Sequence, residues 1–340
     1  MTPRQRHAER RTAIAPRWRF TILTRLLPGV DAERVWTLRD LYEPLPGEVL
    51  LERRIASALA RIWPLVLVAV TLTFAAGLVL VWGIGPRLGS AAAPLVAAIV
   101  MHGLFILVAH EAAHGNLLGR PADDWLGAVA SGALLVPFVA ETFAPVHLRH
   151  HRRTNQRGDT NWSPFRERLF RGSRLLYACY ELIPLLNGFD RLGPRHSRDP
   201  RRVAAAWIAA LAVIAVFRPP FGYWLRVLVG LNAVTTVRFW TEHFDVGIGR
   251  AAHTYRFPLS FGIGNHAVHH EAPGLCAPAL AIGLWFRRKD ASAAAAPLRI
   301  LLSRRYRHLC ALHDEFDPTE GVRHDAVSRL VSPPSTRPAQ

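Results

Sequence analysis

Cysteine and lysine are nearly absent from this chain of 340 residues. The three cysteines, Cys179, Cys276 and Cys310, are an odd number with wide spacing, which excludes a small fold built on disulfides. Lys289 is the only lysine, so the excess of 42 basic over 25 acidic residues consists almost wholly of arginine. Half of the residues are apolar and the mean hydropathy is +0.13, which excludes a wholly disordered chain. A chain this basic reaches a positive hydropathy only if charged and apolar residues are segregated, as they are in membrane proteins.

Two long uncharged runs predict membrane-spanning helices. Residues 62–86 and 88–110 contain 25 and 23 residues, and about 20 helical residues cross a hydrocarbon layer. Residues 203–217 and 221–239 are weaker candidates, which can span if the arginines near their ends reach the interface. We expect residues 125–140, which contain glycine and proline, to be interfacial or only partly inserted. The predicted fold class is an all-α integral membrane protein with about four transmembrane helices in two hairpins, plus interfacial helices.

The arginines predict which parts of the chain share one side of the membrane. Residues 1–61, 111–202 and 240–340 are rich in arginine, whereas the short loops around Arg87 and Arg218 hold one each. Cytoplasmic loops carry the excess of basic residues, so we expect both termini and all three large segments to be cytoplasmic. The net charge of +17 then reflects topology and attraction to lipid head groups. We expect no binding to nucleic acid, because no recognition motif accompanies the arginines.

The expected organisation has three parts. Residues 1–60 form a cytoplasmic arginine-rich arm with an amphipathic stretch at 50–62 and no apolar core of a cleavable signal peptide. Residues 61–285 form the membrane domain with a cytoplasmic, histidine-rich cap. Residues 286–340 form a cytoplasmic segment whose polar tail, from Asp317, we expect to be disordered. The arginine and alanine bias suggests a bacterial genome, and hence the bacterial inner membrane.

Sixteen histidines are the main chemical signal, and many of them fall in three short boxes. The boxes are HEAAH at 110–114, HLRHH at 147–151 and HAVHH at 266–270, and His243 follows the fourth candidate span. Residues i and i+4 share a helix face, so each box presents two or three imidazoles in one direction. The topology places all of these histidines on the cytoplasmic side. One such box is a weak signal, but three boxes and His243 at one membrane face favour a metal centre over structural histidines.

The number of histidines limits the choice of metal. Neutral imidazoles avoid mutual repulsion and bind metal ions. The nine histidines of these motifs are too many for one zinc ion and suit two ions with four or five ligands each. Imidazole binds iron, zinc, copper and nickel, so the ligand type alone does not identify the metal. Iron is favoured by the chemistry that needs a membrane, which is oxygen activation against a lipid C–H bond. The carboxylate pattern of soluble di-iron bundles is absent.

The three boxes, in this order and separated by these spans, resemble those of the membrane fatty acid desaturase family. Residues 147–162 (HLRHHRRTNQRGDTNW) resemble the second box of that family with its downstream Thr-Asn and Asp, and residues 238–243 (RFWTEH) resemble the segment with an extra histidine ligand. The resemblance runs roughly from Trp63 to Pro278. After the third box, Glu271-Ala272-Pro273 replaces the usual apolar residue and proline. The resemblance implies that the iron ligands are His110, His114, His147, His150, His151, His243, His266, His269 and His270.

The hypothesis is a di-iron oxidoreductase that uses O₂ and two electrons to introduce a double bond into a fatty acyl chain. The metal supplies the chemistry, while the protein supplies position and a dry environment. Glu111, Asp159 and Glu242 are candidates to hold ligating imidazoles in the right tautomer, and the alternative is that they are solvated or salt-bridged acids. No flavin, Rossmann or cytochrome pattern is present, so electrons must come from a separate protein such as an acidic ferredoxin, steered by the arginines.

Two rival functions use the same residues. A histidine-box hydroxylase or ketolase acting on lipids or carotenoids would differ only in how the substrate is placed. An intramembrane zinc metalloprotease would use His110 and His114 as ligands and Glu111 as general base, but it leaves the other two boxes without a role.

Several other residues have a simpler interpretation. We expect His102, His196 and His253 to be structural or to support the ligands. Trp63 and Trp125 are expected to be interfacial anchors. Asn265 could bond a ligand or a water, but the pattern favours a helix cap.

Overall fold

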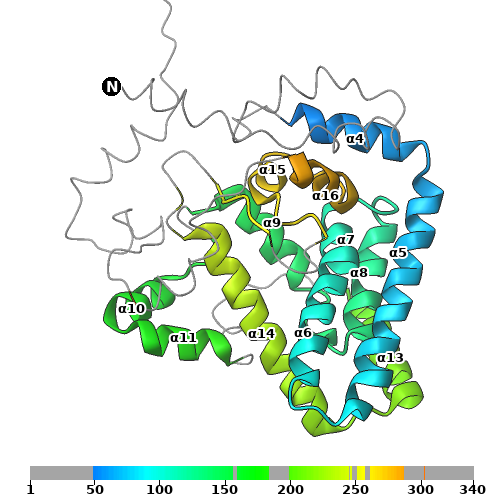
Figure 1. The fold of residues 1–340 in the computed structure, drawn as a ribbon, viewed down its shortest axis with the longest axis vertical. Coiled ribbons are helices and arrows are strands. Elements are labelled where there is room, and N and C mark those ends of the chain that lie inside the picture. Colours follow the sequence, from blue (N-terminus) through cyan, green and yellow to red (C-terminus); the bar gives the residue numbers. More distant parts are fainter. Residues whose placement is uncertain are drawn as a thin grey trace, which may run out of the picture.

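Helices pack side by side below a cap of shorter helices in the computed structural model of the chain (Figure 1). The structure describes residues 49–155, 159–183, 199–244, 246, 251–256, 261–286 and 302. Over these residues it contains helices and no β-strand, as the all-α prediction requires. The expected arm up to residue 48, His196 and the expected tail from Asp317 lie outside the described residues.

Three helices of the described part are long and apolar enough to cross a membrane. The first two are continuous over Trp63–Leu88 and Ala93–His114. Each contains an inserted π-helical turn, and their segments are α5 (Trp63–Leu78), η2 (Val79–Ile84), η3 (Gly85–Leu88), α6 (Ala93–Leu104), η4 (Phe105–His110) and α7 (Glu111–His114). The third is α13 (Pro200–Phe217), where the Asp199 carboxylate accepts a hydrogen bond from the Arg201 amide at the helix start. These helices match three of the four expected spans.

The fourth expected span coincides with α14 (Phe221–His243), a single helix of 23 residues. At 1.5 Å per residue it is about 35 Å long, which is enough to cross the hydrocarbon layer. It carries Arg226 and Arg238, and it is not among the three helices that qualify by both length and hydropathy. It packs closely on α6, because a Cβ atom at Gly230 would lie 2.9 Å from the Ala98 Cβ. Three spans are therefore supported directly, and the fourth remains a proposal.

A shorter helix, α8 (Ala122–Ala133), packs inside the bundle against α13. The two backbones approach so closely at Gly132 that a Cβ atom there would lie 2.0 Å from the Ala206 carbonyl oxygen. Twelve helical residues reach only about 18 Å, so α8 is too short to span. The 3-10 turn η5 (Pro137–Val139) follows it. The length of α8 agrees with the expectation that residues 125–140 do not form a span, and their interfacial or partial insertion stays a prediction.

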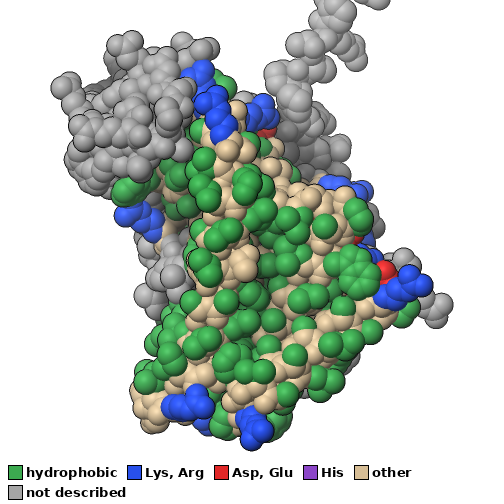
Figure 2. Space-filling view, turned by 90° about the vertical axis from the view of Figure 1, so that its right-hand side faces the viewer, with side chains coloured by type: hydrophobic (Ala, Val, Ile, Leu, Met, Phe, Trp, Pro, Cys, Tyr) green, Lys and Arg blue, Asp and Glu red, His purple; other side chains and the backbone are tan. Residues whose placement is uncertain are grey.

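Apolar side chains cover the outside of the bundle. Figure 2 shows them along the side of the molecule, with Lys and Arg side chains gathered towards its ends. Leu65 and Leu72 on α5 and Ile208 and Val216 on α13 are each exposed by 65% or more. Such a large exposed apolar surface is costly in water and favourable in lipid. The helices and this surface together support membrane association.

Four helices lie at one end of the bundle, around the histidine boxes (Figure 1). They are α4 (Leu50–Ala60), α9 (Phe143–Arg153), α15 (His266–Glu271) and α16 (Ala277–Phe286). The amphipathic stretch predicted at 50–62 is confirmed as α4, which buries Leu51, Ile55 and Leu59 against α16. Two further helices, α10 (Pro164–Gly172) and α11 (Arg174–Leu182), pack beside each other, and α11 contacts α14.

Candidate metal centre

Each histidine box lies on helical residues at the end of the bundle where the cap is. The first box closes the second long helix, where α7 ends at Gly115 with a φ of 75°, a backbone conformation that glycine adopts without strain. The second box lies in the last turns of α9, and the third occupies most of α15. His243 is the last residue of α14. All three boxes therefore include helical turns, so that histidines four positions apart lie on one helix face, as the sequence predicts.

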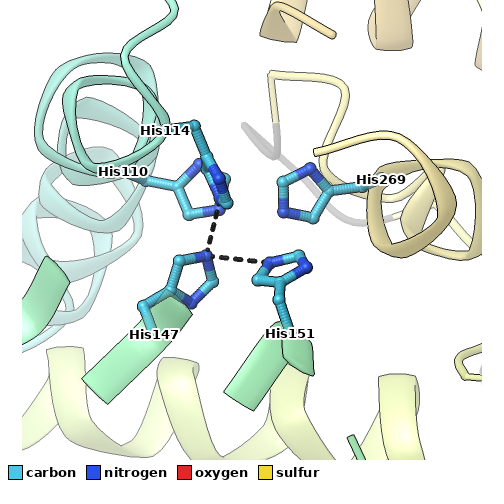
Figure 3. Close-up of side chains that lie close together, drawn as sticks. All are labelled: His110, His114, His147, His151 and His269. Carbon is cyan, nitrogen blue, oxygen red and sulfur yellow. Dashed lines mark hydrogen bonds between the residues drawn. The ribbon is translucent and has the colours of Figure 1, made fainter. Parts of the chain in front are cut away.

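Five histidines from three boxes form one group, which we call the five-histidine cluster (Figure 3). Its members are His110, His114, His147, His151 and His269, whose candidate ligand atoms all lie within 4.8 Å of one another. The Nε2 atoms of His114 and His147 are 2.9 Å apart, and those of His147 and His151 are 3.1 Å apart. Nε2 of His110 and both ring nitrogens of His269 are buried without a hydrogen-bond partner. Buried polar atoms without partners are rare, and these nitrogens fit the donor set of a metal ion.

The other four box and helix-end histidines form a second group, the four-histidine cluster, which comprises His150, His243, His266 and His270. The Nε2 atom of His243 lies 3.2 Å from that of His150 and 3.1 Å from that of His266. His266 and His270 approach through Nε2 at 3.1 Å. The two clusters adjoin, since the rings of His151 and His270 stack at 4.2 Å between centroids. All nine histidines predicted as ligands are thus brought together, in groups of five and four.

Burial keeps the imidazoles of the cap helices neutral. Desolvation, and then the neighbouring imidazoles, lower the pKa of His147, His266 and His269 well below the usual histidine range. The pKa values of His151 and His270 are lowered for the same reasons. Neutral imidazoles retain a lone pair, which is the form that binds metal. Near pH 7 these five imidazoles therefore present lone pairs rather than positive charges.

Asp159 contacts His150 at the ring nitrogen that faces away from the other histidines. Its Oδ1 lies 2.8 Å from the His150 Nδ1, and its oxygens also accept hydrogen bonds from the amides of Asn155 and Asn161. Burial alone would raise the pKa of Asp159, but the His150 ring and these amide donors outweigh it, so the pKa is lowered. An ionised carboxylate at Nδ1 fixes the tautomer that leaves the Nε2 lone pair facing the cluster.

Glu111 also contacts the outer nitrogen of a box histidine. Its Oε1 lies 3.2 Å from the His110 Nδ1, while its Oε2 accepts a hydrogen bond of 2.7 Å from the Ala277 amide at the start of α16. Asn116 donates weakly to the same oxygen at 3.4 Å. One carboxylate oxygen therefore supports the first box, and the other joins it to the start of α16.

Glu242 lies between the last turn of α14 and the third box. Its Oε1 accepts a hydrogen bond from the Tyr255 hydroxyl and forms an ion pair of 3.1 Å with Arg238. Its Oε2 lies 3.4 Å from the His266 Nε2 and 3.9 Å from the His243 Nε2. All three carboxylates predicted near the site are therefore buried and in contact with a box histidine or His243. None of them is a solvated acid, but Glu242 is also salt-bridged to an arginine, as the alternative interpretation expects.

The structure also shows supporting residues that sequence reasoning missed. The Thr154 hydroxyl lies 3.0 Å from the His270 Nδ1, and Tyr255 holds Glu242. Thr154 belongs to the Thr-Asn pair after the second box, so its position carried a signal. Tyr255 had none, because its contact joins two segments that only the fold brings together.

The prediction that Asn265 caps a helix is wrong. Asn265 occupies the N-cap position of α15, but its side chain makes no cap hydrogen bond. Its Nδ2 donates to the buried Glu52 Oε1 at 3.0 Å, and this contact orients the amide so that its Oδ1, the atom that would cap the helix, accepts no hydrogen bond. Asn265 therefore links the third box to α4.

The remaining predicted residues have structural contacts or are exposed. His253 contacts the Phe244 carbonyl oxygen at 3.0 Å and His102 is buried in α6, in agreement with structural roles. The Trp63 indole donates to the Leu117 carbonyl, and Trp125 is 41% exposed. Glu271, which departs from the usual sequence after the third box, is exposed at the end of α15 and belongs to no metal-binding group among the described residues.

The chain belongs to the fatty acid desaturase family. The model of that family, described as "Fatty acid desaturase", matches residues 87–282, which is more than half of the chain and includes both clusters and the three carboxylates. No curated protein and no solved structure matches the chain. Membership identifies the protein as a desaturase-type oxidoreductase that associates with the membrane and acts on lipid. Family membership is also consistent with the two histidine clusters, which could hold metal ions.

Proposed function

We propose that this protein is a di-iron, O₂-dependent desaturase that introduces a double bond into a fatty acyl chain at the cytoplasmic face of the membrane. The observation that carries the proposal is the division of nine histidines, six of them buried and three partly buried, into adjoining groups of five and four. A single ion cannot use nine imidazoles, whereas two ions can. Family membership supports the acyl substrate and the reaction class.

The donor atoms fit two iron ions. With metal–ligand bonds of about 2.1 Å, ligands at right angles are about 3.0 Å apart. The Nε2 atoms that approach each other within the clusters are separated by 2.9–3.2 Å. The unpartnered nitrogens of His110 and His269 are further donors in place. The five-histidine cluster would hold one iron and the four-histidine cluster the other.

Bound iron would activate O₂, which is the oxidant, and the balanced reaction converts –CH₂–CH₂– with O₂, two electrons and two protons into –CH=CH– and two water molecules. The chain's own residues do the rest. Asp159 and Glu111 hold protons at Nδ1 of His150 and His110, which keeps the opposite ring nitrogens available. The buried cap excludes water, and the apolar helices adjoin the lipid from which an acyl chain arrives.

The membrane domain spans residues 61–285 in this proposal, with α14 as a fourth span and both termini in the cytoplasm of a bacterium. The arginine-rich segments support this orientation through the positive-inside rule. Electrons then reach the site from a separate soluble protein, and an acidic ferredoxin suits the basic cytoplasmic face.

The test compares lipids from a bacterial strain with and without the gene, grown in air. We expect a new unsaturated acyl chain that requires O₂, and its loss in a His150→Ala variant that is expressed to the same level. A hydroxylated or ketonic lipid or carotenoid would assign the protein to the hydroxylase or ketolase class instead. An unchanged lipid profile, or unsaturation that persists in His150→Ala, would contradict the proposal.

A further inference from the structure

One carboxylate approaches the histidine clusters from the side where the ligand nitrogens converge. Asp159 and Glu111 contact their histidines at Nδ1, the nitrogen that faces away from the cluster. Glu242 instead places Oε2 3.4 Å from Nε2 of His266 and 3.9 Å from Nε2 of His243. These two Nε2 atoms are themselves 3.1 Å apart. Glu242 therefore differs from the other two carboxylates in which nitrogen it faces.

The rest of the Glu242 side chain is fixed by its surroundings. The residue is 1% exposed and precedes His243 at the end of α14. Its Oε1 accepts the Tyr255 hydrogen bond and pairs with Arg238, one helical turn earlier. With one oxygen held in this way, the other is directed towards the ring nitrogens of the four-histidine cluster. The candidate ligand atoms of Glu242, His243 and His266 all lie within 4.8 Å of one another.

The spacing suits a shared metal ion. Two ligands on one ion, with bonds of about 2.1 Å, lie between about 3.0 Å apart at a right angle and about 4.2 Å apart when opposite. Both oxygen–nitrogen separations of Glu242 fall inside this interval. A carboxylate that only oriented a ring from outside would contact Nδ1, as Asp159 does.

We propose that Glu242 is itself a metal ligand through Oε2, which gives the four-histidine cluster a fifth donor. The inference rests on the proposed di-iron function and extends it. One iron site then has five neutral imidazoles, and the other has four imidazoles and one negative carboxylate. The two sites differ by one unit of charge, and so their iron ions differ in electronic environment.

The experiment uses the full chain, purified in detergent and loaded anaerobically with ferrous ⁵⁷Fe. We expect two Mössbauer doublets of equal area in the wild type. In Glu242→Gln, which keeps the size of the side chain, one doublet shifts and the other is unchanged, and one of the two irons binds at least tenfold more weakly. Glu167→Gln is the matched control, because Glu167 is equally buried but bonds to Trp162 and Arg171 in the α10 region. It should leave both doublets in place.

A second measurement observes the carboxylate directly. The infrared difference spectrum between metal-free and iron-loaded wild type should contain a shifted carboxylate stretching band, which disappears in Glu242→Gln wherever that variant folds. Two irons with no carboxylate band, or with both doublets unchanged in Glu242→Gln, would overturn the assignment of Glu242 and leave the di-iron proposal intact. Wild type that retains fewer than two irons would overturn the proposed function and this inference together.

Discussion

At the scale of single residues, the site depends on which nitrogen of each imidazole carries the proton. His150 shows the principle most clearly, because Asp159 contacts its Nδ1 at 2.8 Å and its Nε2 lies 3.2 Å from the Nε2 of His243. The carboxylate is kept ionised by amide donors as well as by the ring. The proton is therefore held on the outer nitrogen, and the inner nitrogen is left as a donor for metal.

Replacing Asp159 by Asn should weaken iron binding without unfolding the protein. The amide keeps the shape of the side chain but loses the negative charge that stabilises the His150 tautomer, so we expect iron affinity to fall by about 10–100-fold. Equilibrium titration with ferrous iron under argon measures this change. Iron affinity equal to that of the wild type would show that the contact with His150 has no role in metal binding.

The grouping of the candidate ligands could be predicted from sequence because each box carries its own geometry, whereas most supporting contacts could not. His110 and His114, for example, share a helix face whatever surrounds them. The contact of Tyr255 with Glu242 and that of Asn265 with Glu52 depend on which segments the fold brings together. Asn265 was predicted as a cap because the local pattern could not reveal a buried carboxylate more than 200 positions away.

At the scale of helices, contacts of α4 hold the helices of the cap together. This helix packs its apolar face against α16 and places Glu52, which is completely buried, beside Asn265 and close to Gly283. A Cβ atom at Gly283 would lie 2.6 Å from the Glu52 Oε1, so only glycine leaves room for the carboxylate there. The third box follows directly after Asn265, and α4 therefore supports its position.

Glu52→Ala should destabilise the cap. The substitution removes a buried hydrogen bond to the Asn265 amide and leaves a cavity, for which we expect a loss of about 1–3 kcal/mol in the free energy of unfolding. Thermal unfolding of the detergent-purified protein measures it, with Arg53→Ala on the exposed face of the same helix as the control. Equal melting temperatures for the two variants would exclude a supporting role for Glu52.

The contact between α8 and α13 gives a second prediction at this scale. Gly132→Ala places a methyl group against the Ala206 carbonyl, where no flexible side chain can move aside, so the helices must separate. We expect a loss of about 1–3 kcal/mol. Gly172→Ala in α10 is the control, since a Cβ atom there meets nothing within 4 Å. A melting temperature unchanged by Gly132→Ala, relative to the wild type, would argue against this packing.

The helices differ in how well sequence predicts them. The absence of charge at 62–86 and 88–110 predicts two helices, and the apolar content of 203–217 predicts α13. The π-helical turns η2 and η4 could not be predicted, because one extra residue in a turn leaves no mark on an apolar run. Hydropathy does not identify α14 as a span, because its arginines lower its mean hydropathy. One of these arginines, Arg238, pairs with Glu242 beside the histidines.

At the scale of the whole molecule, an apolar bundle is combined with arginine-rich segments of the chain. The charge of +17 comes from arginines that lie outside the two uncharged runs. Arginine-rich segments attract anionic lipid head groups and acidic proteins. In the proposed function these segments lie on the side from which electrons arrive.

Turnover with a purified acidic ferredoxin should therefore depend strongly on salt. Screening shortens the electrostatic range from about 10 Å at 0.1 M to about 3 Å at 1 M, so we expect the second-order rate to fall at least ~10-fold across that interval. The control replaces ferredoxin by a small neutral reductant, with which the rate should change little. A flat salt dependence with ferredoxin would contradict electrostatic docking.

The central claim, that the two histidine clusters hold two iron ions, is tested most directly by elemental analysis. Iron and zinc are measured together in the detergent-purified full chain after anaerobic loading with ferrous iron. The account predicts two irons per chain, and fewer in His269→Ala and in His150→Ala, which each remove a ligand from a different cluster. One tightly bound zinc ion without iron, or no stoichiometric metal in a folded sample, would contradict it.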